Sequence, residues 1–185
     1  MQNKLELRPT LLSQRSALAA DQRALFDRRL AEKILQWWRT EQPASLGVYC
    51  PMRGEPDLHL AYIELHALGV QLALPMIIAD TAAMEFVTWT PGEPLRKDRF
   101  GAGIPAADNP VIQPQALLVP CLGFNAECFR LGYGGGFYDR TLAAEPRPRT
   151  LGVAYAFGEV DFAAEVYDIP LDAVVTEEAT FRSRA

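Results

Sequence analysis

Short apolar runs alternate with stretches of helical periodicity along this chain, and that alternation restricts its fold more than any other feature. Residues 11–39 carry apolar side chains at helical spacing with a break at residues 19–21, which predicts two helices. A further helical period runs from Leu58 to Leu68 and ends at Gly69. Between and after these helices we expect strands at residues 44–50, 70–74, 84–89, 116–119, 150–154 and 173–176.

Strands that alternate with helices favour an α/β fold in which helices cover both faces of one mainly parallel sheet. The 185 residues fit one such unit, so we expect residues 1–185 to form a single three-layer α/β/α domain. The Pro- and Gly-rich segment 90–114 is interpreted as a long excursion of the same domain. In a sheet of this kind, ligands bind beyond the carboxyl ends of the strands.

Composition excludes several classes of partner. The formal net charge of −5 supplies no basic surface for nucleic acid, and no apolar run is long enough to span a membrane. Cys50, Cys121 and Cys128 show no CxxC spacing and have only two histidines beside them, which argues against a zinc site. We therefore expect a cytoplasmic protein that acts on small molecules.

The stretch RLGYGGGFYDR, residues 130–140, follows the buried strand 116–119 and precedes a helix expected over 137–144. Glycines let backbone N–H groups converge on an anion, and a helix N-terminus adds a favourable dipole, so phosphate is the expected ligand. The stretch matches neither GxxxxGK[ST] nor GxGxxG, and a tight turn with a helix cap explains the glycines equally well. Arg130 and Arg140 can clamp phosphate oxygens and Asp139 can hold magnesium, which favours the phosphate interpretation.

Together with LLVP and LGF upstream, this stretch resembles the signature of the 5-formyltetrahydrofolate cyclo-ligase family. The likeness continues in KLELR, YCPMRGE, FVTWTPG and DIPLDAVVT, which are residues 4–8, 49–55, 86–92 and 168–176. The resemblance implies a cyclo-ligase fold of the CoA-transferase-like kind. It also implies an enzyme that closes 5-formyltetrahydrofolate to 5,10-methenyltetrahydrofolate with ATP and Mg²⁺ and releases ADP and phosphate. We expect the protein to be a monomer.

The resemblance also implies site residues by position. Those expected to bind ATP are Lys4, Arg8, Arg130, Gly132, Tyr133, Gly134, Gly135, Gly136 and Phe137. Those expected to contact the folate are Met52, Glu55, Trp89 and Tyr138, and the expected magnesium ligands are Asp139 and Asp172. Without the resemblance, Lys4 and Arg8 suit a solvated helix face, Trp89 suits the core, and Asp172 suits a turn.

No covalent nucleophile is expected, because no Ser/His/Asp or Cys/His set is evident. Five residues depart from the family pattern: Cys121 and Cys128 replace glycines, Asn125 replaces an aspartate, Gly158 replaces a glutamine and Ala106 replaces a glutamate. Two other functions stay open. One is a catalytically silent nucleotide- or folate-binding regulator, and the other is a sugar-phosphate isomerase-like enzyme that uses the glycine loop for a single phosphate.

Overall fold

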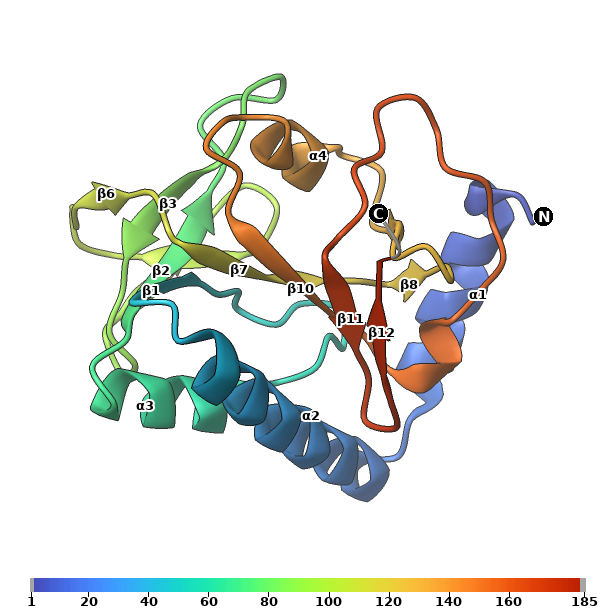
Figure 1. The fold of residues 1–185 in the computed structure, drawn as a ribbon, viewed down its shortest axis with the longest axis horizontal. Helices are drawn as coiled ribbons and strands as arrows, with labels where there is room; N and C mark the ends of the chain where they lie inside the picture. The colour runs from blue at the N-terminus through green and yellow to red at the C-terminus, as the bar shows by residue number, and fades with distance from the viewer. Residues whose placement is uncertain (1, 184–185) are drawn as a thin grey trace.

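The computed structural model describes residues 2–183 and contains an eight-stranded sheet with helices against both of its faces (Figure 1). The helices are α1 (Lys4–Ala17), α2 (Ala20–Glu41), α3 (His59–Ala67), α4 (Phe137–Leu142) and the 3₁₀ turn η1 (Ala156–Gly158). The strands are β1 (Ser45–Gly47), β2 (Gln71–Met76), β3 (Glu85–Thr88), β4 (Leu95–Lys97), β5 (Gly103–Pro105), β6 (Val111–Ile112), β7 (Ala116–Pro120), β8 (Gly123–Phe124), β9 (Arg130–Leu131), β10 (Arg149–Val153), β11 (Ala173–Val175) and β12 (Thr180–Arg182).

The main sheet has the strand order β12-β11-β10-β7-β1-β2-β3-β6. The neighbouring strands from β11 to β2 pair in parallel, while the pairs β11–β12, β2–β3 and β3–β6 are antiparallel. The expectation of a mainly parallel α/β sheet is therefore confirmed. The carboxyl ends of the parallel strands meet at one edge of the sheet, which is where such folds bind ligands.

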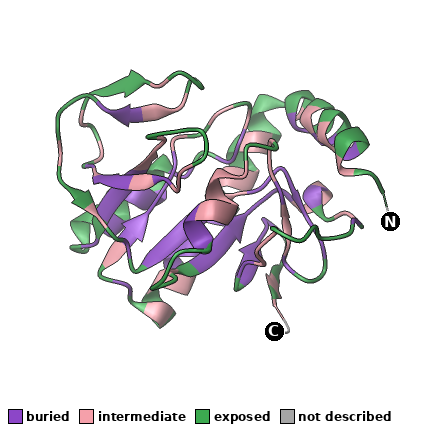
Figure 2. Cartoon of the chain, turned by 90° about the horizontal axis from the view of Figure 1, so that it is seen from above, coloured by how far each residue is buried: buried purple, intermediate pink, exposed green. Residues whose placement is uncertain are grey.

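The sheet separates two hydrophobic layers. Along β7, Ala116 and Leu118 point into a core shared with α2 and α3, whereas Leu117 and Val119 point into a core covered by α4 and the loops around it. This alternation follows from the two-residue period of a strand. Figure 1 shows α2 and α3 on one side of the sheet with α4 on the other, and Figure 2 shows buried central strands between helices with exposed outer faces.

Helix α1 begins at Lys4, seven residues before the start expected from periodicity. The side chain of Asn3 caps it by accepting a hydrogen bond from the Leu5 N–H at 2.9 Å. Leu7 and Leu11 are buried against Leu122, Leu131 and Phe162 in a third apolar cluster. This packing lays α1 beside the short β8–β9 hairpin and so places the first turns of α1 next to the glycine stretch.

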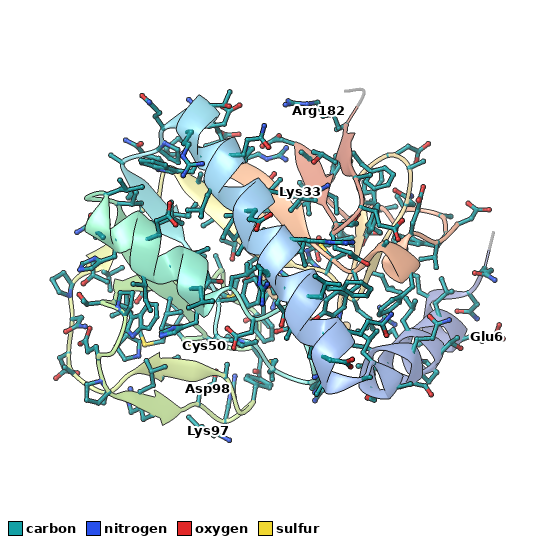
Figure 3. All side chains as sticks on the ribbon, turned by 90° about the horizontal axis from the view of Figure 1, so that it is seen from below. Glu6, Lys33, Cys50, Lys97, Asp98 and Arg182 are labelled. Atoms are coloured by element: carbon teal, nitrogen blue, oxygen red, sulfur yellow. The ribbon has the colours of Figure 1, made fainter. Side chains whose placement is uncertain are left out.

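Segment 90–114, expected to be an excursion, forms the β4–β5 hairpin and the edge strand β6. Figure 3 shows the hairpin, with Lys97 and Asp98 labelled, beside Cys50. A Cβ atom built on Gly103 would lie 3.0 Å from the Cys50 sulfur, so the hairpin packs closely on the loop after β1. Among the residues described, none of the helices combines the length and apolar character that membrane crossing requires.

Candidate active site

A cavity of about 670 Å³ lies at the carboxyl ends of β1, β2 and β7, where Tyr49, Pro75 and Pro120 form part of its wall. The glycine stretch, the first turns of α1 and the β4–β5 hairpin complete it. The sequence-predicted residues that it brings together are Lys4, Arg8, Met52, Glu55, Arg130, Gly132, Tyr133, Gly134, Gly135, Gly136, Phe137, Tyr138 and Asp139. All the proposed nucleotide contacts and most of the proposed folate contacts thus line one cavity.

The glycine loop needs its glycines for conformation and for space. Gly134 and Gly136 have φ values of +94° and +65°, which side-chain-bearing residues rarely adopt. Gly135 lies outside that region, but a Cβ atom there would lie 2.7 Å from the Phe137 ring. The Arg8 Nε–H donates to the Gly132 carbonyl at 2.9 Å, which ties α1 to the loop.

Two cations of the cavity are held by carboxylates. Lys4 forms an ion pair with Asp168, and its Nζ lies 3.2 Å from Glu165. Arg130 donates to Asp139 at 2.8 Å, stacks over the Tyr138 ring, and has a buried Nε without a partner among residues 2–183. Because the Arg130 side chain is only 7% exposed, its charge acts in a poorly hydrated environment.

Glu55 lies on another wall of the cavity and is only 6% exposed. Its carboxylate accepts the Met52 N–H at 3.0 Å and the Tyr133 hydroxyl at 2.9 Å. Burial raises the pKa of Glu55, while these hydrogen bonds and the charges of Arg15 and Arg53 oppose the rise. The side chain of Tyr133, which we expected to serve ATP, therefore points to the glutamate expected to serve the folate.

Trp89 and Asp172, predicted as folate contact and metal ligand, do not line this cavity. Trp89 packs edge-on against Tyr62 with ring centroids 6.3 Å apart and lines a separate cavity of about 460 Å³. The Asp172 carboxylate accepts the Thr150 N–H at 2.7 Å and its hydroxyl at 3.0 Å. It lies just before β11, at the amino ends of the parallel strands. The prediction that Asp139 and Asp172 meet at one magnesium site is therefore corrected, because only Asp139 lines the cavity.

The model of the 5-formyltetrahydrofolate cyclo-ligase family matches residues 1–177. The chain belongs to that family. Among curated relatives, the Mycoplasma pneumoniae 5-formyltetrahydrofolate cyclo-ligase is 26% identical and covers 95% of this chain and 99% of its own length. The Escherichia coli K12 cyclo-ligase is 29% identical over 88% of this chain and 93% of its own.

Solved structures agree with the fold. The Aquifex aeolicus 5,10-methenyltetrahydrofolate synthetase aligns with a TM-score of 0.83 and 28% identity, covering 98% of this chain and 93% of its own. The Mycoplasma pneumoniae synthetase aligns with a TM-score of 0.80 over 95% and 99% of the two chains, at 23% identity. The cyclo-ligase fold is thus confirmed, and this family member is an enzyme of the ligase class.

Sequence reasoning missed three residues of this cyclo-ligase site. Asp168 and Glu165, which hold Lys4, were not singled out, and neither was Arg15, which donates to Tyr133. A signal for Arg15 was present, because Lys4, Arg8 and Arg15 recur at spacings that place them on one side of a helix. Nothing in the local sequence indicates the partners of Lys4, since 164 residues separate it from Asp168.

Proposed function

We propose that the protein closes 5-formyltetrahydrofolate to 5,10-methenyltetrahydrofolate while ATP is converted to ADP and phosphate. The observation that carries the proposal is the joint lining of one cavity by the glycine loop, its cations and Glu55. Backbone N–H groups and arginines suit phosphates, and a carboxylate suits the amino and N–H groups of a pterin. The names of the family and of its relatives support the same reaction.

The chemistry requires activation of the formyl oxygen, which leaves poorly as oxide or hydroxide. If that oxygen attacks the γ-phosphoryl group of ATP, ADP leaves and the formyl carbon becomes electrophilic. The folate N10 then adds to this carbon and loses its proton, and the oxygen departs within inorganic phosphate. Phosphoryl transfer of this kind asks the protein mainly for positioning and charge stabilisation, which Arg130, Arg8 and the loop N–H groups are placed to supply. Helix α4 has only six residues, so we assign little of this to its dipole.

Asp139 is the residue that we propose to hold Mg²⁺. Within residues 2–183, no three His, Cys, Asp or Glu side chains gather into a ready-made metal site. Mg²⁺ bound with a nucleotide needs only one or two carboxylates, because phosphate oxygens and waters complete its coordination. The half-buried Asp139 carboxylate in the cavity fits that requirement, and the bound ion would neutralise phosphate charge.

Turnover is expected to require both ATP and Mg²⁺, because the charge on the transferred phosphoryl group must be neutralised. The measurement is formation of the methenyl chromophore from 5-formyltetrahydrofolate, with nucleotide or magnesium omitted or a chelator added. Product formation without nucleotide would favour the isomerase-like alternative. Tight binding of both ligands without turnover would favour the silent regulator.

Gly134→Val is expected to weaken ATP binding by at least about tenfold, because the side chain must adopt a strained backbone and faces Arg8. Gly92→Val is the matched control, since Gly92 has φ +92° and open space around its Cβ position. Both variants should lose about 1–2 kcal/mol of stability to left-handed strain. Equal ATP affinities of the two variants, measured by calorimetry, would show that Gly134 serves only the turn.

Gly135→Val is expected to disturb the packing of the loop as well as the approach of a phosphate to its backbone. Its side chain would collide with Phe137, which itself packs edge-on against Phe100. We therefore propose Gly134 as the cleaner probe of the phosphate site.

We also propose that residues 1–185 form a single domain and that the protein is a cytoplasmic monomer. Light scattering of the purified protein tests the monomeric state.

A further inference from the structure

Arg15 is a buried arginine directly behind the wall of the cavity. Its side chain lies on the inward face of α1, and the residue is 1% exposed. One Nη donates to the Cys121 carbonyl at 2.8 Å and the other to the Tyr133 hydroxyl at 2.9 Å. Its Nε is buried with no partner in the part of the chain that the structure describes. Burying a guanidinium costs desolvation free energy. The two hydrogen bonds offset only part of this free energy, because the Nε has no partner among the described residues.

The direction of the hydrogen bonds follows from chemistry. A guanidinium can only donate, so the Tyr133 oxygen must accept from Arg15. The Tyr133 hydroxyl proton is then directed to Glu55, whose Oε1 lies 2.9 Å away. The other Glu55 oxygen accepts the Met52 N–H at 3.0 Å. Arg15 therefore orients the Tyr133 hydroxyl toward Glu55, so that each Glu55 carboxylate oxygen accepts a hydrogen bond.

We infer that Arg15 is a positioning residue for the folate side of the cavity, acting on Glu55 through the Tyr133 hydroxyl. The inference rests on the proposed function, because it takes Glu55 as a contact of the reduced folate. Arg15 itself does not line the cavity, whereas Tyr133 and Glu55 both do. We assign its effect on the substrate to the link through Tyr133 to Glu55, because its other hydrogen bond goes to the backbone carbonyl of Cys121.

The charges around Glu55 give the inference a second consequence. Arg53 stacks over the Tyr133 ring at 4.9 Å, and Tyr49, Tyr138 and Cys121 are further titratable groups that interact with the Glu55 charge. Burial raises the pKa of Glu55, and the cations Arg15 and Arg53 lower it. Loss of the Arg15 charge thus moves this pKa further up, and the ionised carboxylate is lost at a higher pH on acidification.

The test compares Arg15→Met, Tyr133→Phe and the double variant with wild type. Arg15→Met should weaken 5-formyltetrahydrofolate binding by about tenfold or more, the loss found when an orienting partner is removed. ATP affinity should stay within about twofold, and the acid limb of kcat/KM should move to higher pH. In the Tyr133→Phe background the effect of Arg15→Met on folate affinity should largely disappear, because the link between the two residues is already broken.

Arg23→Met is the matched control, since Arg23 donates to the Arg15 carbonyl at 3.1 Å from the neighbouring helix α2. It removes an arginine near the same helix junction, and both affinities should stay unchanged. If Arg15→Met does not fold, Arg15→Lys replaces it, because a single ammonium keeps the charge but cannot reproduce the planar fork. A folded Arg15 variant that binds folate normally, loses both ligands equally, or adds its effect fully to that of Tyr133→Phe overturns the inference. Failure of wild type to form the methenyl product would instead overturn the proposed function on which the inference rests.

Discussion

Asp139→Asn is expected to lower kcat by about tenfold to a thousandfold at saturating substrates, the range for lost electrostatic groups. The amide keeps the shape of the side chain and can still accept the Arg130 hydrogen bond of 2.8 Å. It lacks the negative charge that a hard cation requires. The fold should therefore survive while the magnesium–nucleotide complex is no longer held in place.

Asp172→Asn is the matched control for this change. Asp172 lies outside the cavity and binds Thr150 and Arg147, so we expect kcat to stay within about twofold of wild type. Its effect should appear instead as a small drop in melting temperature, because a partly exposed ion pair with Arg147 is lost and such pairs contribute little to stability. Steady-state kinetics over a magnesium titration, together with thermal melts, separate the two outcomes. A larger loss of kcat in Asp172→Asn than in Asp139→Asn would return the metal to Asp172.

Heavy oxygen placed in the N5-formyl group is expected to appear almost completely in inorganic phosphate after one turnover. The label is expected there because a phosphorylated formyl oxygen can depart only as part of phosphate. The geometry demands that the γ-phosphate at the glycine loop and the formyl group share one cavity, as residues 132–136 and Glu55 do. Mass analysis of phosphate and ADP is the measurement.

The control for the label is unlabelled substrate turned over in heavy-oxygen water. Direct transfer leaves the released phosphate unlabelled in that experiment, whereas separate hydrolysis of ATP would label it. Phosphate that draws its new oxygen from water in both experiments would exclude direct transfer. The roles proposed for Arg130 and the glycine loop in aligning the two substrates would then fail, while the family assignment would stand.

The sequence by itself determined the parts of the protein that depend on local pattern. Two-residue and helical periods predicted the mainly parallel sheet with helices on both faces, because burying an apolar face requires that periodicity. The stretch at residues 130–140 indicated the loop, since Gly134 and Gly136 adopt a backbone conformation that glycine favours. Most of the site residues that the family resemblance implied, all but Trp89 and Asp172, also line the cavity.

Only the tertiary structure decided which side chains meet. Trp89 and Asp172 stand in segments that resemble the family, yet the ring packs into a neighbouring core and the carboxylate lies at the amino ends of the strands. The hydrogen bond from Arg15 to Tyr133 joins residues 118 positions apart, and Lys4 meets Asp168 across 164. Local periodicity depends on near neighbours in the chain, so it can be recognised in a single sequence. A hydrogen bond or ion pair depends on distance and burial, which exist only once the packed elements bring remote segments together.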